Sequence, residues 1–445
     1  MPHKLSGARP GQSLKDYRRD HLLESWSSFP NTSAAAAYFQ LTQHIELYSI
    51  DKEALDAALE TDDVKAKLQA MPTLLHEVRH WLDHVSTLWG QQDLVTTYNA
   101  MHSRMANVET EFWRIIEYRR ATRRDRFESY FTTINDRISP PGDTRWKWEL
   151  SCGFGFDERG RLNDARPIVF TRFSWKDGRL ACRVPFSVAS LLETNAMHFE
   201  IGSEVSLVSE LPDGEREVET AERRRGHLLQ LYNPDLAVYS TAAHLVANRL
   251  HLKDVETTYE LSSCLATLSL NLPDAWFPRL RIPDKFADWS SRTNALINTL
   301  DRGFAFIVLA TNAPERTKTQ SVSEWCEAIL SASNLPSLER LRYDALGQME
   351  QIGNRALGGV RGNILQGLLA DGRNLFKQIG PMVRLRDFLP MFTSIGIPPL
   401  ILSDLSVIVR GYGSREGTEL AVEEWINRVG RLNGQFNEFV AACGF

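Results

Sequence analysis

The amino-acid sequence predicts a mainly helical α+β protein with a small antiparallel β-sheet. Between residues 73 and 89, apolar residues recur at spacings of three and four, the pattern of a helix with one buried face. A similar helical texture returns from residue 187 onward. Between residues 146 and 186, β-rich runs alternate with polar turns, which favours strands joined by hairpins.

Length, composition and charge narrow the class of protein. The chain has 445 residues, 43% of them apolar, which is enough to bury a large core without covalent cross-links. Its 51 basic and 56 acidic side chains give a formal net charge of −5, too near balance to indicate a polyanionic partner. We therefore expect no nucleic acid among its partners.

Cysteine usage and hydropathy point to the cytoplasm. The five cysteines are widely scattered and form no CxxC pair, as expected for reduced thiols. Residues 1–26 carry charges throughout and lack the apolar run of a secretory signal. Residues 392–409 are strongly apolar, but Pro398, Pro399 and Asp404 interrupt them, so we interpret this stretch as buried core. A cytoplasmic protein with no membrane partner is the prediction.

The first part of the chain is expected to be a polar arm followed by a strand and helices. Residues 1–40 form the N-terminal arm, rich in basic residues, Pro, Gly and Ser. The elements expected next are a strand at His44–Ile50 and helices at 51–69, 73–89 and 94–127. Pro72 is expected to open the second of these helices, where its missing N–H does no harm.

The rest of the chain is expected to be a small sheet followed by helices. The helices expected after the sheet span residues 188–200, 228–250, 255–268, 289–300, 322–331, 338–352 and 418–442. We divide the chain into the arm 1–40, a core region 41–270 that includes the β-rich segment 146–186, and a helical C-terminal region 271–445.

One motif carries chemistry. Residues 76–80 read His-Glu-Val-Arg-His, and they fall inside the helix expected at 73–89. Two histidines four residues apart project from the same side of a helix, so His76 and His80 can bind one tetrahedral zinc ion. Glu77 then lies beside the open coordination position and can act as general base toward a zinc-activated water.

A catalytic zinc needs a third protein ligand, and we choose Glu193. It lies in the apolar run SVASLLETNAM, where a carboxylate is out of place unless something positive holds it. The small Ala196 one turn later would allow a close approach to the motif helix. The rival ligands are His84, His198, Glu200 and His102.

Other polar residues are candidates for supporting roles. Tyr239 and His244 are predicted to supply the group that steadies the oxyanion. Asp83 and Asp235 are candidates to accept the outer N–H of a ligand histidine. The edge of the sheet at 146–186 offers a strand against which a peptide can lie extended.

The motif region resembles a known family. The segment LHEVRHWLDHVSTLWG, residues 75–90, resembles the active-site helix of zincin metallopeptidases, and LLETNA, residues 191–196, resembles the glutamate helix of their gluzincin branch. It is similar in particular to poorly characterised bacterial HExxH proteins. The resemblance implies a zincin-like, mainly helical scaffold, with His76, His80 and Glu193 as ligands and Glu77 as base.

The sequence departs from that family at two positions. Arg79 stands where zincin helices usually carry an uncharged residue, and Met197 stands where an aspartate is expected. A carboxylate that orients a ligand histidine must therefore come from elsewhere.

The function expected from these residues is that of a zinc-dependent peptidase. Its substrate would be a protein or peptide, and its cofactor one Zn²⁺ ion. An unrestrained protease would endanger its own cytoplasm, so we expect narrow specificity or control by an activating partner protein.

Two alternatives use the same residues differently. Arg79 and His84 fit the Arg-His-x-x-x-His pattern of HEPN-type ribonucleases, which cleave RNA without metal in a dimeric helical bundle. The other alternative is a catalytically silent zincin-like protein that binds or regulates without turnover.

Overall fold

The protein is described by a computed structural model that covers residues 35–408. Short gaps fall at 41–42, 106–108, 126, 128–130, 138–145, 157–158, 318, 359 and 393–394. Most of the predicted N-terminal arm and the helix expected at 418–442 lie outside the described residues. Among the helices of the described part, none has the length and apolar character needed to cross a bilayer.

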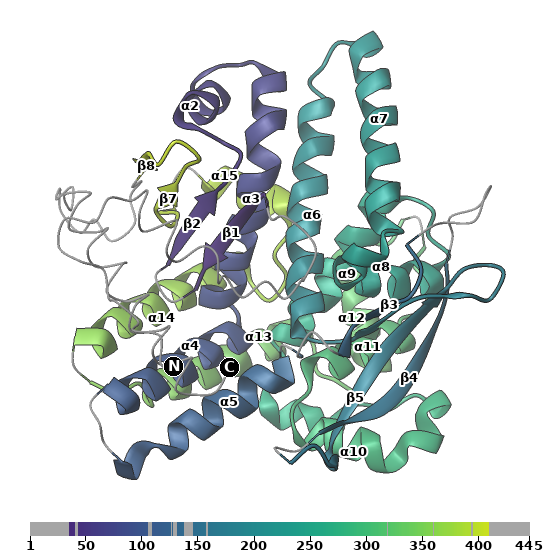
Figure 1. Cartoon of the computed structure of the whole chain (residues 1–445), viewed down its shortest axis with the longest axis vertical. Helices are drawn as coiled ribbons and strands as arrows, with labels where there is room; N and C mark the ends of the chain where they lie inside the picture. Colours follow the sequence, from purple (N-terminus) through teal and green to yellow (C-terminus); the bar gives the residue numbers. More distant parts are fainter. Residues whose placement is uncertain are drawn as a thin grey trace, which may run out of the picture.

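Two helices run side by side through the middle of the molecule (Figure 1). They are α3 (Val64–Ser86) and α6 (Val188–Val208). His76 of α3 contacts Glu200 of α6, whereas Asp83, further along α3, contacts Asn195, which comes earlier in α6. The two helices are therefore antiparallel, and α3 is the helix that carries the HExxH motif.

The start of α3 differs from the prediction. The carboxylate of Asp63 accepts the backbone N–H of Lys65 and caps the helix, which therefore begins at Val64. Pro72 lies buried inside α3 instead of opening it, so that prediction was wrong. The helix expected at 51–69 is in fact α2 (Lys52–Glu60) followed by the first turns of α3. The start of α3 is therefore determined by the cap at Asp63 and not by Pro72.

Further helices pack on both sides of this pair. α8 (Ala237–Leu250) and α9 (Val255–Leu270) lie against α6, while α4 (Leu88–Met105) and α14 (Val360–Ile379) lie against α3. Their apolar side chains form two large clusters. One cluster joins α6, α8 and α9 to α11 (Arg302–Asn312), and the other joins α3, α4 and α14.

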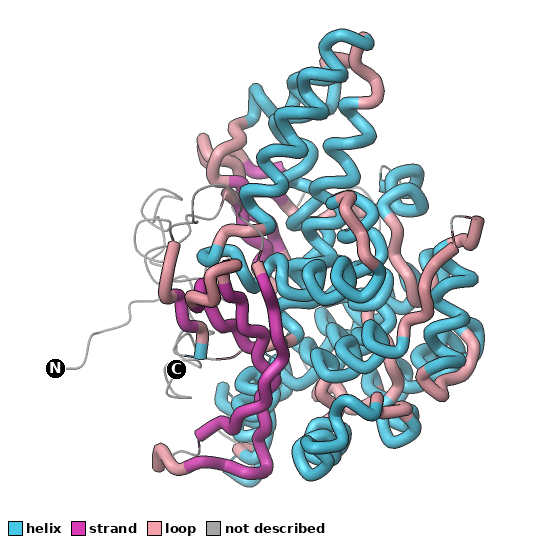
Figure 2. The backbone as a smooth tube through the Cα atoms, turned by 90° about the vertical axis from the view of Figure 1, so that its right-hand side faces the viewer, coloured by secondary structure: helices cyan, strands magenta, loops and turns pink. Residues whose placement is uncertain are grey.

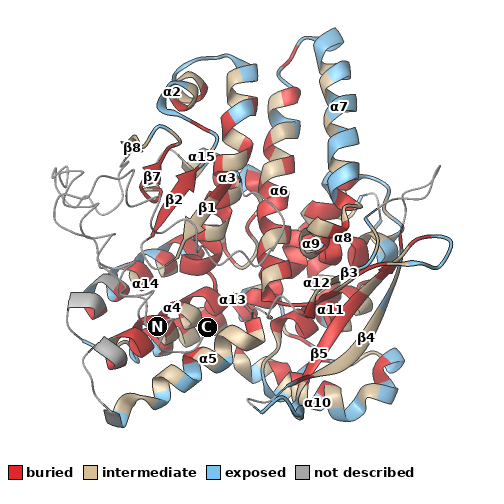
Figure 3. Ribbon diagram, in the orientation of Figure 1, coloured by how far each residue is buried: buried red, intermediate tan, exposed pale blue. Residues whose placement is uncertain are grey.

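One helix is packed differently from the others. Figure 3 shows α6 mostly buried, whereas its neighbour α7 (Asp213–Leu231) is mostly exposed. The contact between α6 and α7 includes polar pairs, since Glu204 of α6 binds both Arg223 and His227 of α7. α7 therefore adds little apolar surface to the core.

Two small sheets accompany the helices (Figure 2). The first has the order β1-β2-β7-β8, with β2 parallel to β7 and the other pairs antiparallel. The second is antiparallel throughout, in the order β3-β6-β5-β4. The strands are β1 (Ala36–Phe39), β2 (His44–Leu47), β3 (Thr133–Ile134), β4 (Lys147–Phe156), β5 (Leu162–Ser174), β6 (Leu180–Pro185), β7 (Leu400–Ile401) and β8 (Val407–Ile408).

The mainly helical α+β class is confirmed, with several boundaries moved. The segment 94–127, expected to be one helix, contains parts of two helices. The segment 228–250 also contains parts of two helices, because Asn233 and Pro234 interrupt the helix there. The sequence patterns did not predict α11, α14, α15 or most of α7. The remaining helices are α5 (Trp113–Asp125), α10 (Ser290–Asn298), α12 (Val322–Ala332), α13 (Leu338–Gly353) and α15 (Leu385–Phe392), with 3₁₀ turns at Glu109–Glu111, Pro234–Leu236, Asp274–Arg279 and Asp284–Trp289.

The backbones of α14 and α3 touch at a glycine, which generates a stability prediction. A Cβ atom at Gly372 of α14 would lie 1.8 Å from the carbonyl oxygen of Val85. We expect Gly372→Ala to lower the free energy of unfolding by about 1–3 kcal/mol or more, because α14 must move away from α3. The measurement is denaturant unfolding followed by circular dichroism.

The same helix offers the matched control. Gly367 of α14 is exposed and has open space where a Cβ would stand. Gly367→Ala should therefore stabilise the protein by up to about 1 kcal/mol through helix propensity. Equal effects of the two substitutions would contradict a backbone contact between α14 and α3.

Candidate metal centre

Three ligand atoms meet where α3 faces α6. His76 and His80, one turn apart on α3, and Glu193 on α6 place one ligand atom each within 4.8 Å of the others. The Nε2 atoms of the two histidines each lie 3.5 Å from Oε2 of Glu193. A tetrahedral zinc ion with bonds of about 2.0–2.2 Å separates its ligand atoms by about 3.3–3.6 Å. The spacing therefore suits such an ion.

The surroundings of Glu193 also fit a cation. Its Oε2 atom is buried and makes no hydrogen bond within the described part of the chain. Burying a carboxylate oxygen without a donor is costly unless a positive charge compensates it. Two imidazoles and one carboxylate are also a usual donor set for catalytic zinc, although other divalent ions can bind such sites.

Glu200 holds one of the ligand histidines. Nδ1 of His76 donates to Oε2 of Glu200 over 2.8 Å, which leaves Nε2 directed at Glu193. A carboxylate bonded to the outer nitrogen of a histidine fixes the ring and makes the other nitrogen a better ligand. The sequence interpretation considered Glu200 only as a rival ligand. Its spacing of seven residues from Glu193, two helical turns, places both on one face of α6 and was the available signal.

Negative charge dominates the centre. Burial would raise the pKa of Glu193, but the positive charge of His80 and the interaction with His76 lower it to about 2. Burial likewise lowers the pKa of His76, yet Glu193 and Glu200 outweigh it and hold the pKa well above the usual value. The carboxylates thus favour positive charge at His76, and a bound cation would supply positive charge at the same place.

Glu77 lies beside the ligands without joining them. Its side chain is buried, and burial raises its pKa while the neighbouring histidines partly oppose that shift. The backbone of Tyr38 in β1 also lowers the pKa of the carboxylate, so Glu77 lies beside the first sheet. A buried carboxylate next to the ligands is positioned to exchange protons with a reacting water.

Tyr239 of α8 reaches the same centre. Its ring centroid lies 6.4 Å from that of His76. Burial raises the pKa of Tyr239 well above its usual value, and the charges of Glu193, Glu77 and Glu200 add to the shift. The hydroxyl therefore keeps its proton, and the ring lies beside His76.

The structure does not bring His244 to the ligands. Its Nε2 donates to the carbonyl of Leu231 over 2.9 Å, and its ring packs against Trp146, Phe173 and Tyr232. Burial lowers the pKa of His244 to about 4, so the ring is neutral. The recorded contacts are those of a core histidine, because the polar edge of its ring is satisfied by the backbone of α7.

The candidates for orienting a histidine are also engaged elsewhere. Asp83 binds Arg79 and Asn195, and Asp235 forms an ion pair with Arg137. Of the rival ligands, His84 is buried, and its Nδ1 bonds to the carbonyl of His80. The cluster found among the described residues includes neither His84, His198, Glu200 nor His102.

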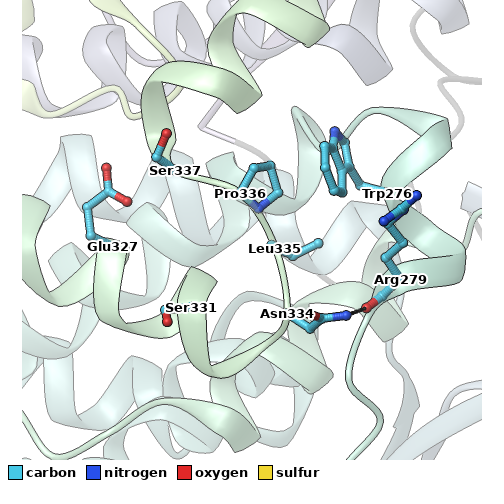
Figure 4. A pocket seen from close by; sticks show the side chains of 8 residues that line it. All are labelled: Trp276, Arg279, Glu327, Ser331, Asn334, Leu335, Pro336 and Ser337. Atoms are coloured by element: carbon cyan, nitrogen blue, oxygen red, sulfur yellow. Dashed lines mark hydrogen bonds between the residues drawn. The ribbon is translucent and has the colours of Figure 1, made fainter.

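A separate hollow lies outside this centre. It has a volume of about 550 Å³ and opens between α12, the start of α13 and the 3₁₀ turn at Asp274–Arg279 (Figure 4). Trp276, Arg279 and Glu327 line it. None of the candidate ligands or catalytic residues is part of its wall.

Comparison with known proteins adds no assignment. No protein-family model, curated protein or solved structure matches this chain. The case for a function consequently rests on the geometry of the centre itself.

The metal ligands generate a direct prediction. His80→Ala and Glu193→Ala should each weaken zinc binding by more than about 100-fold. Removing a group that only hydrogen-bonds a metal ligand already lowers metal affinity by about 10–100-fold. Zinc affinity is measured by competition with a chelating indicator. His102→Ala, on α4, is the matched control and should keep full affinity. Unchanged binding by Glu193→Ala would remove Glu193 from the ligand set.

The burial of His244 generates a prediction on pH dependence. The folded-state pKa is about 4, whereas the ordinary value is 6.5, so the unfolded chain binds an extra proton between these pH values. The contribution of His244 is fully present above pH 6.5 and is lost as the pH falls toward 4, by about 1.4 kcal/mol per pH unit. His244→Gln should flatten that slope in urea titrations and retain zinc. An unchanged slope would contradict the buried, neutral ring.

Proposed function

We propose that this chain is a zinc-dependent peptidase of the cytoplasm. The observation that carries the proposal is the convergence of His76, His80 and Glu193 at spacings that suit one tetrahedral ion. Three protein ligands leave the fourth position open for water or substrate, which is the arrangement of a catalytic rather than a structural zinc site. Glu77 and Tyr239 next to these ligands add a base and a hydroxyl donor.

The chain's own residues have distinct roles in this proposal. His76, His80 and Glu193 hold the ion, and Glu200 orients His76 through Nδ1. A bound zinc ion would supply Lewis acidity, lowering the pKa of water and polarising a carbonyl. Glu77 accepts the proton of the attacking water and passes it to the leaving amine. The hydroxyl of Tyr239 donates a hydrogen bond to the oxygen on which negative charge develops.

A peptide substrate is supported by the strand beside the base. β1 pairs only with β2 within the described part of the chain, and the backbone of its Tyr38 lies close enough to Glu77 to lower the pKa of that carboxylate. An extended peptide can add to such an edge through main-chain hydrogen bonds, which would bring a peptide carbonyl to the centre. The sequence interpretation had assigned this role to the sheet at 146–186. β1 is the better candidate, because it contacts α3, the helix that carries Glu77.

The ribonuclease alternative has less support. Arg79 is fully buried and donates to Asp83, Thr267 and the carbonyl of Val383. An RNA-cleaving arginine must reach a phosphate, which a fully paired and buried guanidinium does not do. His84 is likewise buried, with Nδ1 bonded to the backbone of α3.

One substitution separates a peptidase from a silent zincin-like protein. Glu77→Gln should lower peptide hydrolysis by about 10²–10⁴-fold, because the amide cannot accept the proton of the attacking water. Zinc binding should persist, since Glu77 is not a ligand. The measurement is cleavage of a peptide library by zinc-loaded protein, followed by mass spectrometry and by zinc titration of both proteins.

A matched substitution controls for the change itself. Glu350 is exposed on α13, and Glu350→Gln should leave both cleavage and zinc binding unaltered. Zinc-loaded wild type that cleaves no peptide would favour the silent binding protein. Cleavage that survives Glu77→Gln would assign the proton transfer to another group.

A further inference from the structure

A closed network of buried polar groups joins the two ligand-bearing helices to a third. Arg79 and Asp83 belong to α3, Asn195 to α6, and Ser263 and Thr267 to α9. All five side chains are at most 1% exposed. Buried polar groups of this kind are stable only when each finds its partners.

The hydrogen bonds of the network are complementary at each step. Nε and Nη2 of Arg79 both donate to Oδ1 of Asp83, over 3.1 and 3.0 Å. The other oxygen of Asp83, Oδ2, accepts Nδ2 of Asn195 over 3.0 Å. Oδ1 of Asn195 in turn accepts the hydroxyl of Ser263 over 2.8 Å and that of Thr267 over 3.4 Å. Both carboxylate oxygens and both ends of the amide are thus used.

Arg79 extends the network beyond these helices. Its Nη2 also donates to the hydroxyl of Thr267 over 2.8 Å, and Nη1 donates to the carbonyl of Val383 over 3.1 Å. The guanidinium lies 5.0 Å from the ring centroid of Phe199 in α6. The guanidinium is therefore fixed by contacts with α6, α9 and the segment before α15.

The network adjoins the metal ligands in sequence and in space. Arg79 precedes His80 directly, Asp83 follows it by three residues, and Asn195 follows Glu193 by two. The bond between Asp83 and Asn195 fixes how α3 and α6 are aligned along their axes. A slip of one turn would displace the ligands by about 5.4 Å, far more than a zinc site tolerates.

We infer that Arg79, Asp83 and Asn195 are positioning residues that set the register of α3 against α6 and so hold His80 opposite Glu193. This inference rests on the proposed metal centre. It explains why an arginine lies inside the HExxH motif, since the side chain of Arg79 helps to hold the helices in alignment. Directional hydrogen bonds in a buried environment accept one alignment, whereas apolar contacts alone accept several.

An exchange of the two bonded groups tests the inference. Asp83→Asn alone directs the new amide N–H₂ group either at the N–H₂ group of Asn195 or at Arg79, so that a donor faces a donor. Asn195→Asp alone directs a new carboxylate at the carboxylate of Asp83, so that an acceptor faces an acceptor. In the double variant, the new amide at position 83 accepts from Arg79 and donates to the new carboxylate at position 195. That carboxylate can still accept from Ser263 and Thr267, so each hydrogen bond has a counterpart.

The measurements are zinc affinity by chelator competition and the visible spectrum of the Co²⁺-loaded protein. We expect each single variant to bind zinc about 10–100-fold more weakly and to show an altered Co²⁺ spectrum. The double variant should return to within about threefold of wild type, an interaction that independent sites would not show. Thermal unfolding, recorded in parallel, defines the folded fraction of each protein.

The control and the contrary outcomes are specific. Asn99→Asp on α4 alters a buried amide that bonds Arg355 and Leu357, and it should cost stability without changing zinc affinity. Single variants that bind zinc as wild type does, or a double variant that stays as weak as the singles, would overturn the positioning role while leaving the metal centre intact. Wild type that binds no zinc would overturn both.

Discussion

The register between α3 and α6 is the constraint on which the rest of the centre depends. Along this antiparallel pair, His76 meets Glu200, His80 meets Glu193, and Asp83 meets Asn195. Each contact involves one residue from each helix, so none survives a shift of one helix along the other. The apolar clusters hold the helices together, and these directional polar contacts favour the one alignment in which their partners meet.

The same alignment explains why so many charged groups can be buried in one place. Taking Arg79, Asp83 and Glu193 out of water is unfavourable unless each finds an opposite charge or a hydrogen bond. Arg79 and Asp83 satisfy each other inside the protein, whereas Glu193 faces two imidazoles with one oxygen still without a donor. The part of the helix interface around Arg79 and Asp83 is therefore complete in itself, whereas the buried oxygen of Glu193 is the atom that the proposed cation would neutralise.

The local part of this arrangement was predictable, and the long-range part was not. Helical spacing within one segment brings His76 and His80 together, and a lone carboxylate in an apolar helix predicts that Glu193 has a positive partner. The role of Glu200 depends on the direction and register of α6 against α3, which no local pattern encodes. His244 shows the converse error, since a polar residue on an apolar helix indicates burial but does not identify its partner. The helix α11 was missed because a continuous apolar run has no period to reveal it.

The position of Glu77 favours chemistry over passive binding. A metal-binding scaffold needs His76, His80, Glu193 and the groups that hold them, but it needs no further carboxylate. Burial raises the pKa of Glu77, and the charges of His80 and His76, together with the backbone of Tyr38, only partly oppose that shift. A buried carboxylate with a raised pKa beside candidate metal ligands is the kind of group that catalytic sites contain. Glu77 therefore supports the proposed peptidase over the silent binder, because metal binding alone does not need this side chain.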